Sequence, residues 1–175
     1  FDTRATIKNK RKSLESSKGI YYSKAESFDF YGDVLVLDEK QSLKADTLFY
    51  AMNSEYASFR SNGIIENENY YILAEEGWVD QLNGNGFLSD HVIITQLQDD
   101  YKLYTDSCIL SKQMSRSKSY GNTLLQLPFN QDTLYLTSDT IFTDELTHLL
   151  NAYYNVNFKT DVIAGYCDSL SFNTD

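Results

Sequence analysis

The sequence predicts an all-β domain built from repeats of about 30 residues, and three observations support this class. A short phrase with a central acid recurs five times along the 175 residues. Fourteen Tyr and ten Phe stand against one Pro, and aromatic rings favour pleated sheets whereas Pro interrupts them. No segment keeps the apolar spacing that marks an amphipathic helix, so we expect little helix.

The first element along the chain is a basic segment. Residues 1–24 carry seven Lys and Arg against two acids, although the whole chain has a net charge of −10. We expect residues 1–13 to form a solvated and partly frayed terminus; contact with an anionic surface or head group is the alternative. The negative net charge argues against nucleic acid as a partner, because phosphates are bound mainly by Lys and Arg.

The recurring phrase reads small residue, acid, often Thr or Ser, then alternating apolar residues. Its copies occupy residues 45–50, 74–79, 105–110, 138–143 and 167–172. The acids, at spacings of 29, 31, 33 and 29 residues, are Asp46, Glu75, Asp106, Asp139 and Asp168. We expect each copy to contribute a β-strand to its repeat.

A second phrase lies between the acid phrases and has an aromatic residue, a small or polar pair and then apolar alternation. Its copies occupy residues 30–36, 59–65, 87–94 and 153–158. Each repeat therefore supplies at least two strands. Asn67-Glu68-Asn69 and Asn83-Gly84-Asn85-Gly86 predict turns between strands. Residues 111–131 show little apolar alternation, so we expect a long loop there.

The acid phrase breaks the alternation of a regular strand. Ala45 and Leu48 are both apolar but lie three residues apart, and strict period two would put them on opposite faces. A bulge or corner at Asp46-Thr47 would bring both residues to the core. Asp suits such a corner because its carboxylate can accept a backbone N–H two residues on.

Carboxylates at one position of every repeat also allow a functional interpretation. They could bind Ca²⁺, or form the paired acids of a polysaccharide-cleaving β-helix. Each repeat offers one acid rather than a dense Asp-Gly pattern, and Glu75 replaces Asp in one copy. Hydrogen bonding at a corner is therefore the favoured interpretation of these acids.

Other catalytic and cofactor signatures are missing from the sequence. His91 and His148 are the only histidines and have no metal-ligand spacing. There is no nucleophile elbow, no phosphate-binding glycine loop and no C-x-x-C motif. We therefore predict no enzyme activity, no metal and no cofactor. Trp78 and the tyrosines are expected to pack in the core and across strands rather than to stack on sugars.

The two cysteines, Cys108 and Cys167, lie in acid phrases two repeats apart. If successive repeats stack as neighbouring strands, their separation is about 10 Å. A disulfide needs Cα atoms within roughly 7 Å. We expect two free, buried thiols that behave as small apolar side chains.

Together, the two phrases resemble the OstA-like family of periplasmic lipopolysaccharide-transport proteins, which includes LptA, LptC and the N-terminal domain of LptD. The resemblance covers the chain from about residue 20 to its end and is carried by residues 30–36 with 43–50, by 132–140, and by 155–158 with 165–170. It implies a twisted β-jelly roll of two antiparallel sheets, open at both ends, that stacks head to tail through its edge strands.

On this basis residues 1–175 form a single OstA-like domain. No signal peptide is visible and the first residue is Phe, which is typical of a mature or trimmed chain. An acid phrase directly precedes the last residues, so the chain is compatible with a piece of a longer one.

The resemblance also implies a function. An OstA-like domain carries lipopolysaccharide through the periplasm with its acyl chains in an apolar groove, so the implied ligand is lipopolysaccharide or another lipid. The implied partners are other OstA-like domains, and the implied location is the periplasm or cell envelope. The expected groove lining, called the interior set below, is Val34, Val36, Leu48, Tyr50, Val92, Ile94, Leu110, Ile141, Val156, Phe158, Leu170 and Phe172. Each CH₂ sheltered there would contribute about 0.8 kcal/mol.

Two further interpretations stay open. The chain could be a structural or adhesive cell-envelope module with a packed interior, or a carbohydrate-binding β-repeat protein. An open apolar groove would favour lipid carriage, a closed core would favour the structural module, and converging carboxylates would favour an enzyme. The negative net charge suits lipid phosphates poorly, so head groups would stay in solvent or meet the basic N-terminal segment.

Overall fold

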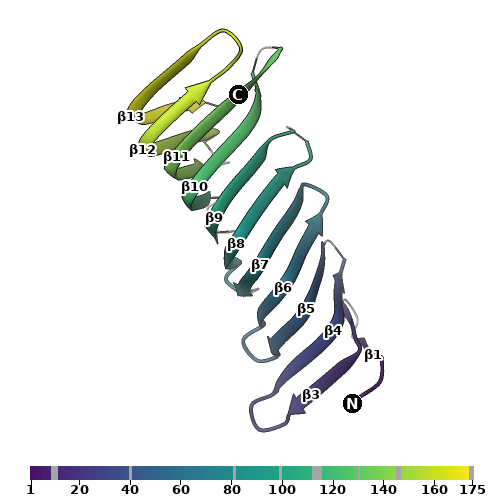
Figure 1. Ribbon diagram of the computed structural model, residues 1–175. Coiled ribbons are helices and arrows are strands. Elements are labelled where there is room, and N and C mark those ends of the chain that lie inside the picture. The colour runs from purple at the N-terminus through teal and green to yellow at the C-terminus, as the bar shows by residue number, and fades with distance from the viewer. Residues whose placement is uncertain are drawn as a thin grey trace.

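A computed structural model describes residues 1–8, 12–39, 41–80, 82–98, 100–111, 116–129, 131–144 and 147–173. It shows a single antiparallel sheet of thirteen strands (Figure 1). The strands are β1 (Ala5–Lys8), β2 (Lys12–Ser16), β3 (Lys18–Tyr22), β4 (Ser27–Asp38), β5 (Gln41–Ala51), β6 (Tyr56–Asn67), β7 (Tyr70–Asp80), β8 (Asn85–Gln96), β9 (Lys102–Ser111), β10 (Arg116–Phe129), β11 (Asp132–Asp144), β12 (Leu149–Lys159) and β13 (Ala164–Asn173). No helix occurs among the described residues, as the sequence predicts.

Almost every strand pairs with its neighbours in the chain, so the sheet runs in sequence order from β4 to β13. At the N-terminal end, β2 and β3 share one side of β4: β2 pairs with residues 35–38 and β3 with residues 27–31. β1 pairs with β2 and completes this split edge. At the opposite end, the last strand among the described residues is β13.

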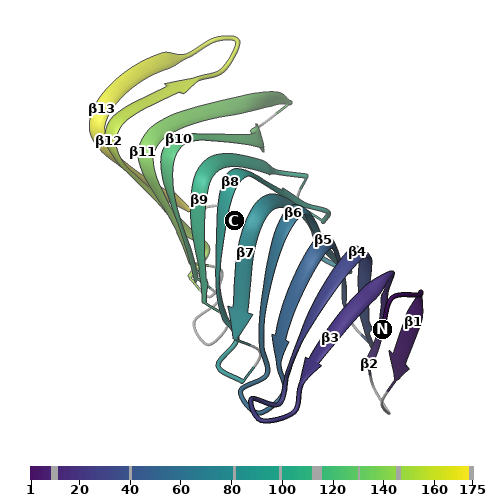
Figure 2. The ribbon, with the colours of Figure 1, turned by 60° about the horizontal axis from the view of Figure 1, so that its bottom comes forward.

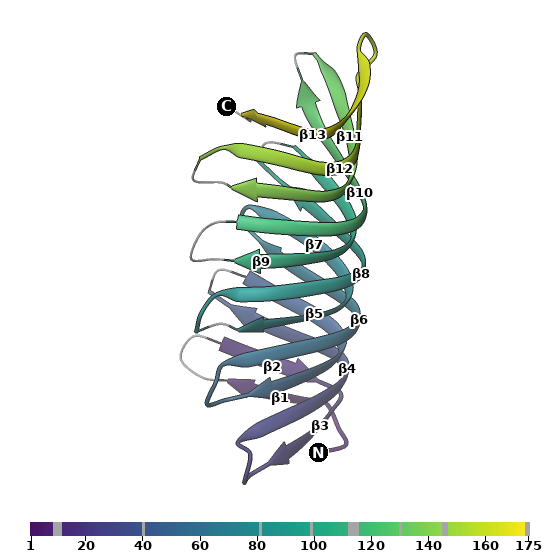
Figure 3. The same cartoon turned by 90° about the vertical axis from the view of Figure 1, so that its left-hand side faces the viewer.

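The long strands bend near their middle, and the sheet becomes a twisted trough (Figures 2 and 3). The strand halves on the β3 side form the first arm, from residues 27–31 in β4 to residues 169–173 in β13. The halves on the β2 side form the second arm, from residues 34–38 to residues 164–167. A jelly roll of two antiparallel sheets was expected; in the structure the two arms of one continuous sheet correspond to them.

The core lies between the two arms. Phe30 and Leu48 in the first arm, and Val34 and Ala45 in the second, belong to one cluster of buried side chains. The predicted parity break is thus confirmed, because Ala45 and Leu48 are both buried although three residues separate them. Close packing also explains Gly63: a side chain there would overlap the ring of Phe59 and the carbonyl oxygen of Ala74.

Two predictions about irregular segments are wrong. β10 occupies Arg116–Phe129, so most of the expected loop at residues 111–131 is a strand; residues 112–115 lie outside the described part. The expected frayed terminus at residues 1–13 contains β1 and the start of β2, because their backbone groups pair with each other and with β4; residues 9–11 lie outside the described part. None of the described segments is a helix long and apolar enough to cross a membrane.

Candidate functional site

The bend of the sheet is built from pairs of residues with positive φ. Such pairs occur on every second strand from β4 to β12, and the strands between them have none at the bend. The pairs are Gly32-Asp33, Ser61-Asn62, Asp90-His91, Gly121-Asn122 and Tyr154-Asn155. Gly and Asn suit these positions because they tolerate left-handed backbone conformations best. The second phrase of the repeat therefore encodes the bend.

The repeated acids lie opposite these left-handed pairs. In the β4–β5 ladder, Tyr31 pairs with Thr47 and Val34 with Ala45, so two residues oppose Asp46 alone. The bulge predicted at Asp46-Thr47 is therefore in the right place, but the extra residue belongs to the neighbouring strand. The same offset recurs at each later acid, including Asp168 opposite Tyr154 and Asn155.

Three of the acids accept a hydrogen bond from an Asn side chain on the next strand. Asn62 Nδ2 donates to Asp46 Oδ2 at 2.7 Å, Asn122 Nδ2 to Asp106 Oδ2 at 2.8 Å, and Asn155 Nδ2 to Asp139 Oδ2 at 2.8 Å. Each Asn follows its acid by 16 residues. We call this row of acid–amide bonds the corner ladder.

At Glu75 the donor is different: this carboxylate accepts the backbone N–H of Asn62 at 3.3 Å rather than an Asn side-chain amide. Sixteen residues after Glu75 stands His91, at the position that Asn fills elsewhere. The sequence predicted corner hydrogen bonding for the acids, and this is confirmed. The predicted partner, a backbone N–H two residues on in the same strand, is wrong for the acids whose bonds the structure shows.

The corner acids do not converge into a catalytic or metal site. They stand on alternate strands, with a left-handed pair between each two. Neighbouring strands are about 4.8 Å apart, so successive acids are separated by roughly 10 Å along the bend. Within the described ranges, no group of three or more His, Cys, Asp or Glu side chains is placed to hold a metal ion.

The interior set lies on the inner faces of both arms. Val34, Leu48, Val92, Ile94, Ile141 and Val156 are buried close to the bend. The other members are partly buried and pack against this core: Val36, Tyr50, Leu110, Phe158, Leu170 and Phe172. The core near the bend is thus filled by the protein's own side chains. Solvent reaches Tyr50, Leu110 and Phe172, which lie farther out along the first arm, and it reaches Val36, Phe158 and Leu170 on strands near the two ends of the sheet.

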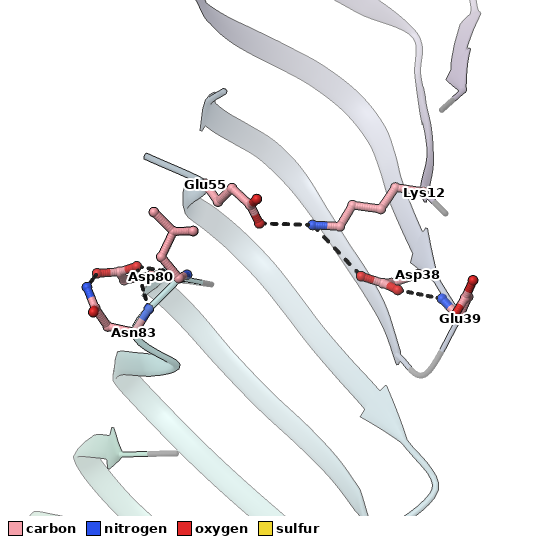
Figure 4. Close-up of polar contacts among 7 residues, drawn as sticks. Lys12, Asp38, Glu39, Glu55, Asp80 and Asn83 are labelled. Carbon is pink, nitrogen blue, oxygen red and sulfur yellow. Dashed lines mark hydrogen bonds and ion pairs between the residues drawn. The ribbon is translucent and has the colours of Figure 1, made fainter. Parts of the chain in front are cut away.

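An ion pair crosses the N-terminal end of the trough (Figure 4). Lys12 on β2 places its Nζ 3.7 Å from Glu55 Oε2 in the β5–β6 turn and 3.9 Å from Asp38 Oδ2 at the end of β4. Because Glu55 follows the first arm and Lys12 belongs to the second, the pair joins the tips of both arms. Burial, and to a smaller degree the charge of Glu55, raises the pKa of Tyr50 just inside.

Most of the exposed large apolar side chains lie at the two ends of the sheet, whereas Met52, Leu82, Leu97, Ile109 and Phe129 are exposed between them. At the N-terminal end they are Phe1, Ile7, Ile20, Tyr21, Tyr22, Tyr31 and Leu37. At the C-terminal end they are Tyr135, Leu149, Tyr153, Tyr154, Val162, Ile163 and Tyr166. Val162 and Tyr166 are both 86% exposed. The pattern of strands did not reveal this clustering, because it depends on which strands form the edges.

The outer face of the first arm carries aromatic residues as well. Tyr56 and Trp78, on the neighbouring strands β6 and β7, stack with ring centroids 5.9 Å apart. Phe49 on β5 lies 6.4 Å from the ring of Tyr56. The prediction of cross-strand packing for Trp78 is confirmed.

Both cysteine thiols are free, and Cys108 is buried whereas Cys167 is half-buried. They lie on β9 and β13, four strands apart rather than the two assumed.

Comparison with solved structures identifies the architecture. The chain superposes with a TM-score of 0.57 on LptH of Pseudomonas aeruginosa, the LptA-homologous periplasmic component of its conserved lipopolysaccharide transport device, over 63% of this chain and 82% of LptH. The fold is LptA-like. Sequence identity in this LptA-like match is 12%, so it concerns the fold alone. No protein-family model and no curated protein matches the chain.

Proposed function

We propose that this LptA-like sheet is a non-enzymatic transport module of the periplasm or cell envelope that holds the acyl chains of lipopolysaccharide, or of another lipid, between its arms. The observation that carries the proposal is the inner face of the trough. It is mainly apolar from β4 to β13, with Ser117, Ser119 and Thr143 as polar residues in the first arm of β10 and β11. Large side chains beyond the buried core remain partly accessible. The likeness to LptH supports the same role.

The partly buried members of the interior set are the expected contacts. Tyr50, Leu110 and Phe172 lie away from the bend, where an acyl chain can reach them without displacing the packed core. Each CH₂ that leaves water there contributes about 0.8 kcal/mol. Head groups stay in solvent outside the trough. At the N-terminal end, the cation of Lys12 is already shared by two carboxylates, which disfavours anionic groups at that point.

Assembly through the sheet edges completes the proposed role. Both ends combine an edge strand with exposed large apolar side chains. Exposing such side chains to water does not stabilise a single domain, whereas it is typical of an interaction surface. Strand addition at these edges would extend the trough from one domain into the next. The proposed partners are other domains of this fold.

Photocrosslinking tests the proposal for lipid. A photoreactive residue at Leu110 or Phe172 should form adducts with labelled lipopolysaccharide. The matched controls are Ile109 and Ser171, which neighbour these positions in the same strands and face the other side of the sheet. Equal labelling of inner and outer positions, or no labelling of folded protein at any of them, would rule out carriage between the arms.

A structural or adhesive envelope module is the second candidate, favoured by one observation. The buried cluster near the bend spans both arms from β4 to β12 and fills the space there. If lipid adducts fail to form while the protein assembles through its edges, this second function is the correct one.

A further inference from the structure

The apolar lining of the first arm is interrupted on two neighbouring strands. One row of inward side chains runs from strand to strand near the tip of this arm, and from β9 to β13 its members are Leu110, Ser117, Thr143, Leu150 and Phe172. Among the described members of this row from β4 to β13, only Ser117 and Thr143 carry aliphatic hydroxyls. The hydroxyl pair therefore lies within the row whose apolar members are expected to contact acyl chains.

The hydroxyl pair has one proton to spare. Ser117 Oγ and Thr143 Oγ1 lie 2.6 Å apart, and either can donate to the other. Two hydroxyls carry two protons, and this bond uses one of them. Neither hydroxyl has a further hydrogen-bond partner among the residues that the structure describes. Because both side chains are only partly buried, the second O–H can reach a ligand in the trough.

Hydroxyls closer to the bend of the same strands have a different role. Thr105 Oγ1 donates to the carbonyl of Tyr120 at 2.8 Å, and Ser138 Oγ donates to the carbonyl of Thr140 at 3.0 Å. Thr105 and Ser138 are buried, so these bonds satisfy backbone groups where the sheet turns. The Ser117–Thr143 pair binds no backbone group in the described chain.

Stability of the sheet does not require hydroxyls at this position. When both partners of a hydrogen bond are replaced by apolar groups of the same shape, stability is nearly unchanged or rises. The neighbours in the row, Leu110 and Leu150, show that apolar side chains fit there. The pair is therefore a candidate for binding rather than for packing, as a few polar groups in an apolar site fix the orientation of a ligand.

The second arm of the same two strands is apolar out to its tip. On β10, alternation turns Leu125, Leu127 and Phe129 inward, and exposure rises from 2% at Leu125 to 43% at Phe129. On β11, Leu134 and Leu136 pair with Leu127 and Leu125 and are buried. At β10 and β11 the trough thus presents hydrocarbon on one arm and hydroxyls on the other, which suits an amphipathic ligand.

The charges beside the pair favour a neutral acceptor. Arg116 Nε donates to Asp144 Oδ2 at 2.8 Å, and the Arg116 guanidinium lies 6.0 Å from the ring centroid of Phe142. Arg116 precedes Ser117 and Asp144 follows Thr143 in their strands. A phosphate at the pair would meet the Asp144 carboxylate nearby, whereas a carbonyl oxygen accepts the spare O–H without bringing a charge.

We propose that the Ser117–Thr143 pair is a polar subsite for the ester or amide linkage between the head group and the acyl chains of a bound lipid. The spare O–H donates to the linkage carbonyl, and the acyl chains extend along the row and across to Leu127 and Phe129. This subsite rests on the carriage of lipid proposed above. It specifies where along the trough the polar part of the ligand stays.

A hydroxyl-free variant tests the subsite on the intact chain. Ser117→Ala combined with Thr143→Val removes both partners and should leave stability nearly unchanged. Its affinity for fluorescently labelled lipopolysaccharide should fall roughly fivefold, the loss expected for one hydrogen bond. Its affinity for diphenylhexatriene, a hydrocarbon that has no carbonyl, should not fall. Thr143→Ser keeps the hydroxyl and should keep the wild-type affinity.

Two further measurements separate binding from folding. Thr137→Val, at an exposed position of β11, is the matched control and should leave both affinities unchanged. Infrared spectroscopy reads the bond itself, because a hydrogen bond to an ester carbonyl lowers its stretching frequency. This frequency should be lower for lipopolysaccharide bound to wild type than for lipopolysaccharide bound to the double variant. If thermal unfolding shows the double variant unfolded, Ser117→Val with Thr143→Val supplies a second hydroxyl-free protein with higher strand propensity.

The other outcomes separate the subsite from the function proposed above. Equal affinities of wild type and the hydroxyl-free variant for lipopolysaccharide would overturn the subsite and leave carriage intact. An equal loss of affinity for diphenylhexatriene, or an unchanged carbonyl frequency, would also overturn it. If wild type binds neither lipopolysaccharide nor diphenylhexatriene, carriage between the arms fails, and the subsite fails with it.

Discussion

Asn122 on β10 donates a hydrogen bond of 2.8 Å from its Nδ2 to Asp106 Oδ2 on β9, across the outer corner of the bent sheet. Asn122 also adopts φ of 42°, so one residue supplies both the backbone turn and the ligand for the acid. Asn122→Ala should therefore lower the free energy of unfolding by about 1–2 kcal/mol, from the lost hydrogen bond and the strained backbone. Urea denaturation measures the difference. Asn85→Ala, at an exposed position of β8, is the control and should change stability little.

Gly121 tests the bend itself. It has φ of +72°, and a side chain there would meet the carboxylate of Asp106. Gly121→Ala should cost about 1–3 kcal/mol, because it combines backbone strain with this overlap. Ser61 holds the equivalent position with φ of 61°, so Ser61→Gly should be neutral or slightly stabilising. A Gly121→Ala variant as stable as the wild type would contradict the bend described here.

Phe59 tests the packing between the arms. Its ring is 2% exposed and lies over Gly63 and Gly77. Phe59→Ala should lower the free energy of unfolding by about 3–5 kcal/mol, because neither glycine can fill the cavity. Phe49→Ala, on the outer face of β5, removes the same ring from a partly exposed site and should cost much less. Similar losses for both variants in thermal or urea unfolding would argue against a core between the arms.

The cysteines should differ in reactivity. Burial raises the pKa of the Cys108 thiol, so its reactive thiolate is disfavoured near neutral pH. Cys167 is half-buried on the edge strand. Labelling with iodoacetamide, followed by mass spectrometry, should modify Cys167 first and Cys108 only slowly or after unfolding. Faster labelling of Cys108 would show that the β9 region opens readily.

Asp132 links stability to pH. Its Oδ1 accepts the backbone N–H of Thr133 at 2.6 Å, and its Oδ2 accepts that of Asp161 at 2.7 Å. These bonds, that of Asp161 first, lower the pKa of Asp132 below its usual value of 3.8. A carboxyl group whose pKa is lower in the folded state stabilises the fold above its unfolded pKa and loses that effect as pH falls through its folded pKa. Asp132→Asn should therefore be less stable than wild type near pH 7.

The pH profile of that difference is the check. The gap in stability between wild type and Asp132→Asn should narrow as pH falls below the ordinary Asp value of 3.8. Asp80 works in the same direction, because Asn83 and Leu82 donate to it and lower its pKa. Asp132→Asn and Asp80→Asn should each remove only the part of the stability loss at low pH that comes from the substituted carboxylate. A gap that stays constant down to strongly acidic pH would show that these bonds do not set it.

The strands and the place of the bend could be predicted from the sequence, because they depend on local patterns: the small residue, the acid and the apolar alternation are visible without tertiary structure. That the two arms belong to one continuous sheet could not be predicted in this way. Residues 120–125, Tyr-Gly-Asn-Thr-Leu-Leu, repeat the second phrase and could have identified β10 in place of the loop expected at 111–131. The flanking Lys and Ser residues obscured this signal, because they replace apolar residues on the first arm.

Other features depend on contacts between distant segments. The ion pair of Lys12 with Glu55 joins residues far apart in sequence, and no spacing rule relates them. The donors of the corner ladder were equally hidden. An acid and an Asn 16 residues apart become neighbours only when the register of a hairpin and its bulge is known. For the interior set, alternation indicates which residues face inward, whereas their depth between the arms follows from the bend.

From β4 to β13, strands with a left-handed pair at the bend alternate strictly with strands that carry a corner acid, and this alternation has a consequence for how such a protein can change in length. A single inserted strand would bring two strands of the same type together, and one corner would lose either its acid or its left-handed pair. Insertion of a whole hairpin preserves the order. Variants of this sheet, natural or designed, should therefore lengthen and shorten in steps of two strands, because only such steps preserve the alternation of strand types on which the bend depends.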